Sequence, residues 1–291
     1  MPLDRPILVL GSQGMLGRAW CELLRQRGEA FEAHDLDTLD VTRKQDLARI
    51  IAMRPAAVIN CVAYTDVDGA ESDESAAELL NTRVPGDLAA ISREIDTLFV
   101  HYSTDYVFGG TNRTPRLPDS MKDPLSVYGR TKLEGERVVT ASGARSLIIR
   151  TSWLYAPWGK NFVLTIANLA RKGDRLRVVN DQRGRPTSAE HLAATSHRLV
   201  SRGEEGLYHI TDGDACTWYE FAEAIVELTG ADCSVEPCTS EEFPRPAPRP
   251  SYSVLDLSEV ETLLGTMPHW RKNLSAVIEQ VYGRVGQREV S

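Results

Sequence analysis

The sequence predicts an α/β fold of the Rossmann type, a doubly wound parallel sheet with a smaller, interleaved C-terminal substrate lobe. Two observations carry this prediction: short apolar runs alternate with helical periodicity in the first half of the chain, and the runs are largely apolar rather than alternating. Strands of that kind belong to a parallel sheet that helices cover on both faces. The expected strands are 7–10, 31–34, 57–60, 98–102 and 147–149.

The helices of the first half follow from caps and periodicity. A helical pattern at 15–27 comes directly after a glycine-rich turn. Thr42 and Gln45 have the spacing of a capping box, which predicts a helix from there to about Met53. Strands and helices therefore alternate up to about Thr151. Further helices are expected at 74–82, 85–94 and 127–140.

Beyond this point the pattern loosens into separate helices with short strands between them. We expect residues 1–151 to form a dinucleotide-binding domain, including the helix that carries a Tyr/Lys pair. Residues 152–291 should form mainly a substrate-binding lobe, with some elements returning to the first domain. The helices expected here are 161–172, 189–202 and 217–229, and the capping boxes are Thr217 with Glu220 and Ser258 with Glu261.

Composition restricts the class of protein. A net charge of -8, from 33 Lys plus Arg and 41 Asp plus Glu, argues against nucleic acid or an anionic membrane as a partner. The five cysteines are scattered, without a C-x-x-C pair or histidines at metal-ligand spacing, which indicates a reduced cytoplasmic protein with no metal site. No apolar stretch approaches the roughly 20 residues of a membrane span. The first apolar run, Ile7 to Leu10, is too short for a signal peptide.

The glycine-rich turn is Gly11-Ser12-Gln13-Gly14-Met15-Leu16-Gly17. Its first glycine permits a tight turn, the second lets the backbone approach a pyrophosphate at the helix N-terminus, and the third lets the helix pack closely on the strand. The alternative is a purely structural turn. Position favours the cofactor, because the turn follows the first strand, opens a helix and precedes Asp35, a candidate ribose ligand at the end of the next strand.

Tyr128 and Lys132 lie four residues apart in the expected helix 127–140, so both side chains leave one face. A phenol with an ordinary pKa near ~10 is a poor proton donor at neutral pH, and an ammonium held close favours the phenolate and lowers that pKa. An isolated pair of this kind would more often be a half-buried tyrosine and a surface lysine. Here Thr104 and Asp105 follow the fourth strand, at the carboxyl end where doubly wound sheets bind ligands. The Thr104 hydroxyl can bond the carbonyl oxygen that Tyr128 protonates.

The order of these motifs resembles the extended short-chain dehydrogenase/reductases and, more narrowly, the dTDP-4-dehydrorhamnose reductases. The resemblance covers nearly the whole chain. Its markers are Gly11 to Gly17, Asn60-Cys61-Val62-Ala63-Tyr64-Thr65, Val67-Asp68, Ala70-Glu71, His101-Tyr102-Ser103-Thr104-Asp105-Tyr106-Val107-Phe108, Tyr128-Gly129-Arg130-Thr131-Lys132, Arg150-Thr151-Ser152-Trp153-Leu154-Tyr155, Asn161-Phe162, Asn180-Asp181-Gln182, Gly184, Pro186-Thr187, Arg249-Pro250 and Ser253.

The resemblance implies a role for each matching residue. Tyr128 would donate a proton, Lys132 would tune it and bind the nicotinamide ribose, and a 4-keto sugar would lie between them and the end of the fourth strand. The implied reaction is hydride transfer from NADPH or NADH to C4 of dTDP-4-dehydro-L-rhamnose, giving dTDP-L-rhamnose. The implied catalytic residues are Thr104, Asp105, Tyr128 and Lys132, and the implied substrate ligands are Val67, Thr104, Asp105, Trp153, Asn161 and Arg249. The implied cofactor ligands are Gly11, Ser12, Gln13, Gly14, Met15, Leu16, Gly17, Asp35, Asp40, Val41, Asn60, Cys61, Val62, Ala63, Thr65, Tyr128 and Lys132.

The sequence leaves two alternatives for both cofactor choice and assembly. Asp35 favours NADH because a carboxylate repels a 2′-phosphate, whereas Arg18 could pair with that phosphate, so dual use is expected. Some family members form a dimer through a divalent metal held by acidic side chains, one of them in the glycine-rich turn. Met15 occupies that stretch here, and a thioether does not replace a carboxylate for a hard cation. A metal-bridged dimer is therefore doubtful despite Glu190, and the chain is expected to be a monomer or a homodimer.

Arg249 lies in a Pro-rich run, 243–250, that has two interpretations. By composition it is a stiff exposed connection. Alternatively, a diphosphate substrate that approaches a protein of charge -8 needs guanidinium groups in fixed geometry, and Arg249 would supply one.

Two other functions fit the same fold. A nucleotide-sugar epimerase or dehydratase would recycle its bound cofactor, but water elimination typically uses Asp-Glu after the threonine, and this chain has Asp105-Tyr106. The other alternative is a non-catalytic regulatory subunit, which the fold alone does not exclude. The intact set of Thr104, Tyr128 and Lys132 argues for an enzyme.

Overall fold

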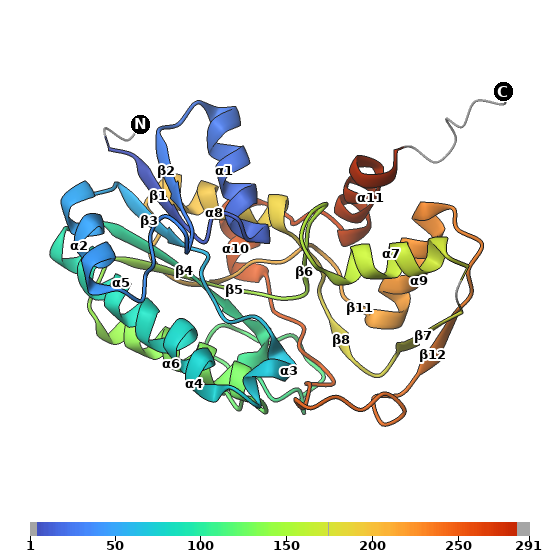
Figure 1. Cartoon of the computed structure of the whole chain (residues 1–291). Helices are drawn as coiled ribbons and strands as arrows, with labels where there is room; N and C mark the ends of the chain where they lie inside the picture. Colours follow the sequence, from blue (N-terminus) through green and yellow to red (C-terminus); the bar gives the residue numbers. More distant parts are fainter. Residues whose placement is uncertain (1–4, 174, 284–291) are drawn as a thin grey trace.

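The computed structural model describes residues 5–173 and 175–283 and centres on a six-stranded parallel sheet (Figure 1). The strand order is β2-β1-β3-β4-β5-β10, and every neighbouring pair is parallel. The order reverses between β1 and β3, which is where sheets of this kind bind ligands. The predicted α/β, Rossmann-type fold class is confirmed. The strands are β1 Ile7–Leu10, β2 Phe31–His34, β3 Ala57–Asn60, β4 Leu98–Thr104, β5 Ser146–Thr151 and β10 Gly206–His209.

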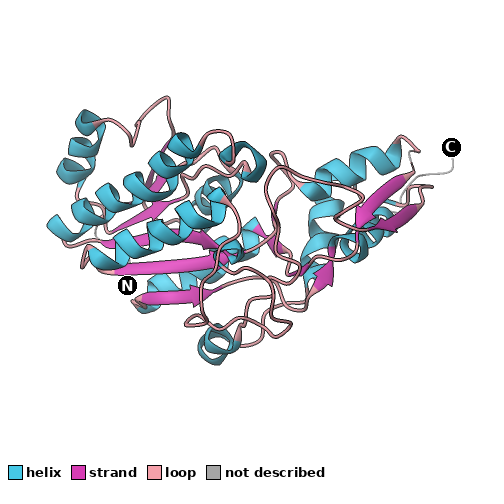
Figure 2. Ribbon diagram, turned by 90° about the horizontal axis from the view of Figure 1, so that it is seen from below, coloured by secondary structure: helices cyan, strands magenta, loops and turns pink. Residues whose placement is uncertain are grey.

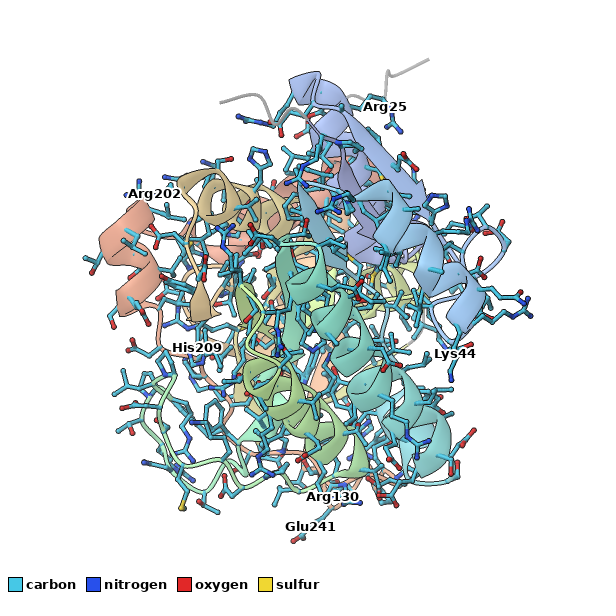
Figure 3. The ribbon with its side chains drawn as sticks, turned by 90° about the vertical axis from the view of Figure 1, so that its left-hand side faces the viewer. Arg25, Lys44, Arg130, Arg202, His209 and Glu241 are labelled. Carbon is cyan, nitrogen blue, oxygen red and sulfur yellow. The ribbon has the colours of Figure 1, made fainter. Side chains whose placement is uncertain are left out.

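Successive side chains of these strands face two different helix layers, which explains why β1 is apolar at every position and β3 at every position before Asn60. Ile7 and Val9 pack with side chains of α1, α8 and α10, whereas Leu8 and Leu10 pack with side chains of α2, α5 and α6. Figure 3 looks onto the second layer, with Arg130 of α6 labelled on its exposed surface. The first layer is α1 Met15–Arg27, α8 Ala189–Arg202 and α10 Ser258–Leu264, and the second is α2 Lys44–Met53, α5 Val84–Glu94 and α6 Val127–Ala141.

A second group of elements lies beside the sheet, and Figure 2 shows the two groups next to each other and joined by loops. Three helices here share an apolar cluster in which Phe221 and Trp270 are buried. The helices are α7 Phe162–Arg171, α9 Trp218–Thr229 and α11 Trp270–Tyr282. The strands form three short pairs, β6 Leu154–Tyr155 with β9 Thr187–Ser188, β7 Leu176–Val179 with β12 Val235–Cys238, and β8 Arg183–Gly184 with β11 Cys216–Thr217.

The C-terminal half of the chain is shared between the two groups. The strand β10 pairs with β5 at the edge of the main sheet, and α8 and α10 cover that sheet, whereas α7, α9 and α11 do not. The division at residue 151 stays a prediction. The outer ends of the two predicted domains, residues 1–4 and 284–291, lie outside the described residues.

Of the three expected capping boxes, one is confirmed and two are wrong. Thr217 and Glu220 exchange both hydrogen bonds of the motif at the start of α9. Thr42 instead donates its hydroxyl to Asp40, and α2 begins one residue later, after Arg43. Ser258 is already the first residue of α10, and its hydroxyl also turns back to an aspartate two residues earlier. In both failures a nearby carboxylate takes the hydroxyl that should cap the helix.

The helices expected at 74–82 and 85–94 are one continuous helical stretch. The short α4, Glu74–Glu78, passes through a π-helical turn, η1 Leu79–Arg83, into α5. Pro85 has no N–H for an ordinary helical bond, so a wider turn before it accommodates the ring without ending the helix. Gly135 of α6 is adjacent, since a Cβ there would lie 2.1 Å from the carbonyl oxygen of Asn81.

Candidate active site

The site forms at the carboxyl ends of β1, β3 and β4, where the glycine-rich turn, the loop after Asn60 and the Thr104-Asp105 segment follow the strands. The first turn of α6, which carries Tyr128, packs against the short 3-10 turn η2, Asp105–Val107, that continues β4. Parallel strands end at one edge, so the topology itself gathers these segments.

The glycine-rich turn is folded so tightly that two of its glycines are required. Gly11 has φ +73°, and a Cβ there would lie 3.0 Å from backbone atoms of Cys61 and Val62. A Cβ on Gly17 would lie 2.0 Å from the carbonyl oxygen of Gly11. Gly14 precedes α1 and offers no side-chain cap to its first amides. The first amides of α1 therefore have no side-chain cap, and such amides can bind an anion such as a dinucleotide pyrophosphate.

Asp35 is joined directly to this turn. Its carboxylate accepts hydrogen bonds from the backbone N–H of Gln13 at 2.8 Å and of Leu36 at 2.9 Å. The backbone N–H of Ser12 bonds the carbonyl oxygen of His34 at 3.1 Å, so the end of β2 and the turn form one unit. Leu16 of the same turn is buried in the core.

Arg18 does not reach freely toward a phosphate. Its guanidinium stacks on the Trp158 ring at 4.4 Å, and its Nε atom lies 3.2 Å from Glu22. The Trp158 indole N–H donates to the carbonyl oxygen of Met15 at 3.1 Å, so the loop before α7 rests on the glycine-rich turn. Arg18 would have to leave both partners to pair with a 2′-phosphate.

Asp40 and Val41 are buried beyond β2. The Asp40 carboxylate accepts from the backbone and hydroxyl of Thr42, and these hydrogen bonds hold the pKa of Asp40 below its ordinary value. Proximity of this pair to an adenine stays a prediction.

The loop after β3 is held under the turn. The amide oxygen of Asn60 accepts from Val62 N–H at 3.2 Å, and its Nδ2 lies 3.3 Å from Nδ1 of His101. Burial raises the pKa of the Cys61 thiol, so this side chain is no nucleophile. Ala63 is partly exposed and Thr65 is exposed on the same loop.

Tyr128 and Thr104 meet at the end of β4. A hydrogen bond with Thr104 lowers the pKa of Tyr128, but burial outweighs it and raises that pKa to about 12. The Tyr128 ring meets the Tyr106 ring edge-on at 5.9 Å. Gly129 allows this approach, because a Cβ there would lie 2.3 Å from the carbonyl oxygen of Tyr106. The phenol is therefore protonated across the neutral range.

Lys132 is placed differently from the simplest expectation. Its side chain is buried, and Nζ donates to the carbonyl oxygen of Tyr102 at 2.5 Å. Burial lowers the pKa of Lys132 to about 8. The expectation that this ammonium lowers the pKa of Tyr128 is not met here, because desolvation of the phenolate is the larger effect and the ammonium is bound to a backbone carbonyl.

The carboxyl group of Asp105 is also buried at this site. Burial raises its pKa to about 7, against hydrogen bonds with Ser253 and Thr104. Its Oδ1 atom accepts from the Thr104 hydroxyl at 3.1 Å, while its Oδ2 atom is buried with no hydrogen-bond partner within the described part of the chain. A buried oxygen of this kind calls for a partner, and a substrate hydroxyl is a suitable donor.

Arg249 forms a two-pronged ion pair with Asp68, at 2.9 and 3.0 Å. Asp68 belongs to the short helix α3, Val67–Ala70, so the Pro-rich segment is tied to the loop after β3. Arg245 lies 3.9 Å from the same carboxylate. Val67, predicted as a substrate ligand, is half-buried in this helix. The Pro-rich run is thus anchored on α3.

A cavity of about 410 Å³ lies between η2 and the second group of elements. Arg245 and Arg249 line it from the Pro-rich run, and Tyr106 lines it from η2. Further aromatic and polar side chains complete the wall, among them Phe162, Arg177, Gln182, Trp218 and Phe243. Of this wall, only Arg249 is a ligand predicted from the sequence. The others come from segments with no recognisable spacing, although Tyr106, Phe162 and Gln182 stood among the markers of the resemblance.

Trp153 and Asn161 are fixed by internal contacts. The Trp153 ring is stacked on Trp218 at 3.6 Å with an angle of 11° between the planes, and its backbone has φ +47°. Asn161 caps α7 through its oxygen and donates to the carbonyl oxygen of Ala156 at 2.9 Å. Contact of either residue with a sugar stays a prediction.

Acidic, cysteine and histidine side chains do not form a group of three or more that could hold a metal ion among residues 5–173 and 175–283. Glu190 lies in the first turn of α8, and burial together with the charge of Glu22 raises its pKa. In the same part of the chain, every helix is too short or too polar to cross a membrane.

A family described as RmlD substrate binding domain matches residues 5–282. The chain belongs to this family. A dTDP-4-dehydrorhamnose reductase of Streptomyces griseus is 40% identical, over 98% of this chain and 97% of that one. A probable dTDP-4,6-dihydroxy-2-methyloxan-3-one 4-ketoreductase of Streptomyces antibioticus is 42% identical, over 92% of each. The resemblance inferred from the motifs is confirmed.

Solved structures agree. A dTDP-4-dehydrorhamnose reductase of Bacillus anthracis in complex with NADP has a TM-score of 0.92 and 30% identity, and the match covers 96% of this chain and 100% of that one. A dTDP-4-dehydrorhamnose reductase of Clostridium acetobutylicum has a TM-score of 0.91 and 39% identity, with 95% and 99% covered.

Proposed function

We propose that this protein reduces the 4-keto group of a dTDP-4-dehydro-6-deoxy sugar, with dTDP-4-dehydro-L-rhamnose as the first candidate and dTDP-L-rhamnose as its product. NADPH or NADH is the proposed hydride donor. The observation that carries the proposal is the hydrogen bond of Tyr128 with Thr104 at the end of β4, where Lys132 bonds the Tyr102 carbonyl oxygen and Oδ2 of Asp105 has no hydrogen-bond partner among the described residues. Membership of a family whose relatives are named as 4-ketoreductases supports the substrate class.

The chain's own residues fit a dinucleotide. The space that a Cβ on Gly11 or Gly17 would fill is taken by backbone, and the first amides of α1 have no side-chain cap. In our proposal the turn from Gly11 to Gly17 holds the pyrophosphate, Asp35 the adenine-side ribose, and Lys132 the nicotinamide ribose. The segments Asp40-Val41 and Asn60 to Ala63, with Thr65, complete that site. When bound, the nicotinamide supplies the hydride for C4.

The protein's part in the reduction is proton donation and orientation. A ketone oxygen that gains negative charge needs hydrogen-bond donors, and Thr104 and Tyr128 offer two hydroxyls at one point. Tyr128 gives its proton to the oxygen, which completes the alcohol. A phenol with a pKa of about 12 is protonated at neutral pH, so its proton is in place, and the alkoxide that forms on C4 is a stronger base than the phenolate and takes that proton. Asp105 is proposed to accept a hydroxyl of the sugar.

The cavity beside Tyr106 is proposed to take the nucleotide half of the substrate. Its aromatic side chains offer flat surfaces to a base, and its arginines offer charged donors to a diphosphate. Arg249 is already paired with Asp68, whereas the Arg245 side chain is 52% exposed. Arg245 is therefore proposed as the more mobile phosphate ligand and Arg249 as the fixed one.

The alternatives carry less support. A dehydratase would have a carboxylate base directly after Asp105, where this chain has Tyr106. Burial raises the pKa of Tyr106 above its ordinary value, so this phenol stays protonated and is unsuited to remove a proton. A regulatory subunit has no need of an assembled Thr104, Tyr128 and Lys132 set. We further propose a cytoplasmic location, where reduced nicotinamide cofactors are available, and a monomer or a homodimer without a bridging metal.

The test is direct turnover. Purified protein is mixed with dTDP-4-dehydro-L-rhamnose and either NADPH or NADH, and the absorbance of the reduced cofactor is followed. The product is identified by nuclear magnetic resonance. The expected result is stoichiometric oxidation of the cofactor with formation of dTDP-L-rhamnose. A parallel arm with dTDP-4-keto-6-deoxy-D-glucose tests a different 4-keto sugar. Failure of both sugars with both cofactors would overturn the proposal.

A further inference from the structure

A buried ion pair joins strand β5 to helix α6. Arg150 of β5 donates to both carboxylate oxygens of Glu136 of α6, from Nη2 at 2.6 Å and from Nε at 2.8 Å. The two side chains are only 1% and 6% exposed. A buried pair of this kind costs much desolvation energy and is a poor device for stability alone. Its position suggests another use.

The pair is tied to the strand that ends in Thr104. The Ser103 hydroxyl donates to Glu136 at 2.5 Å, and the Lys132 ammonium donates to the carbonyl oxygen of Tyr102 at 2.5 Å. Lys132 and Glu136 are one helical turn apart, and Tyr102 and Ser103 are consecutive. Helix α6 is thus fastened to β4 at two successive turns, and Thr104 is the next residue of the strand.

The strands on either side of β5 also help to hold this ion pair. Ser103 is in register with Arg150, and Arg150 is in register with His209, so three adjacent strands present these side chains in one row. Figure 3 labels His209, the last residue of β10. Arg150 also donates to the carbonyl oxygen of Pro118 at 2.8 Å and lies 3.3 Å from Nε2 of His209. These contacts fix the position of the Glu136 carboxylate.

We propose that Ser103, Glu136 and Arg150 are positioning residues of the reductase: they fix α6 along β4 and so set the meeting of Tyr128 with Thr104. The inference rests on the proposed function for its catalytic consequence. Its structural part, the fastening of α6 to β4, can be tested without turnover.

The charge of Glu136 has a second effect. It raises the pKa of Lys132 against the lowering that burial causes, which leaves the value at about 8. The other charged or titratable groups around these two are His101 from β4, whose pKa is lowered by burial and by Lys132, Arg150 from β5, His209 from β10 and Lys122 from the loop before α6. Loss of the Glu136 charge should lower the pKa of Lys132, and activity that needs the ammonium should then fall at a lower pH.

Two substitutions separate position from charge. Ser103→Ala removes one fastening and leaves the ion pair intact, so we expect kcat to fall roughly 10-fold or more with KM within a few fold, because small misplacements of catalytic groups are costly. Glu136→Gln should lower kcat as well and also shift the alkaline limb of the pH profile to lower pH, whereas Ser103→Ala should leave that limb in place. Ser92→Ala is the matched control, since Ser92 is a fully buried serine on α5 whose hydroxyl has no partner within the described residues.

Hydrogen exchange gives the readout that does not depend on turnover. Amides of α6 should exchange faster in Ser103→Ala than in wild type or Ser92→Ala, at unchanged melting temperature. If α6 exchange and kcat both match the control, the proposal is overturned, and Ser103→Ala decides the matter should Glu136→Gln fail to fold. An inactive wild type with faster exchange in Ser103→Ala would instead refute the proposed function and leave the fastening in place.

Discussion

Replacement of Gly17 by alanine should damage both the fold and the cofactor site. A Cβ at this position would lie 2.0 Å from the carbonyl oxygen of Gly11, 2.7 Å from its carbonyl carbon and 2.8 Å from the Cα of Ser12. Real contacts of this kind stay above 3.0 Å, so α1 and the turn must separate by about 1 Å. Both sides of the clash are backbone, and no side chain can rotate away. We expect a loss of roughly 1–3 kcal/mol in the free energy of unfolding, as in other overpacked sites.

The same movement displaces the amides that are proposed to bind the pyrophosphate. We expect the dissociation constant for NADPH or NADH to rise about 10-fold or more, equal to about 1.4 kcal/mol of binding energy. Unfolding is followed in urea, and binding by isothermal titration calorimetry, in wild type and variant.

Gly86 provides the matched control. It also lies inside a helix, α5, but the nearest atom to a Cβ there is a flexible Val138 methyl carbon at 3.4 Å. Gly86→Ala should therefore stabilise the protein by up to about 1 kcal/mol through helix propensity and leave cofactor binding unchanged. A Gly17→Ala variant with wild-type stability and affinity would refute the account of the turn.

Four further substitutions test the proposed roles of single side chains. Tyr128→Phe should lower turnover by roughly 10² or more with cofactor affinity within a few fold, because only proton donation is lost; near-normal turnover would remove the assignment. Lys132→Met should lose turnover and cofactor affinity together, and calorimetry of cofactor binding checks the second part. Arg249→Ala should raise the KM for the nucleotide sugar far more than it lowers kcat, and an unaltered KM would leave the Pro-rich run as a stiff connection. Asp35→Ala should move the ratio of specificity constants toward NADPH, and NADH that is inert with wild type would contradict the role of this carboxylate.

The core of the sheet was predictable because buried parallel strands leave a plain signal. The run at 57–60 is apolar up to its last residue because both faces of β3 are covered, and its predicted bounds match those of the strand. The same holds for the first helix, whose start is fixed by the glycine-rich turn. A pattern that depends on burial alone therefore predicted the bounds of these elements correctly.

Local polar patterns were less reliable. The spacing of Thr42 and Gln45 is that of a capping box, yet Asp40 competes for the hydroxyl and moves the start of the helix. The π-helical turn before Pro85 leaves no spacing to recognise. The sequence placed Tyr128 and Lys132 on one helix face, but only the structure shows how far burial moves their pKa values in opposite directions.

The wall of the cavity shows why chemistry and specificity differ in how well a sequence reveals them. The proposed catalytic residues stand in short motifs, Thr104 at the end of β4 and Tyr128 four residues before Lys132 on α6. The cavity wall instead joins segments far apart in the chain, and the ion pair that anchors its Pro-rich side links Asp68 with Arg249, 181 residues away. Relatives named for different 4-keto sugars match this chain over 92% or more of its length. In our proposal, replacement of Phe162, Trp218 or Phe243 should therefore change which nucleotide sugar binds. Proton donation by Tyr128 should stay unchanged.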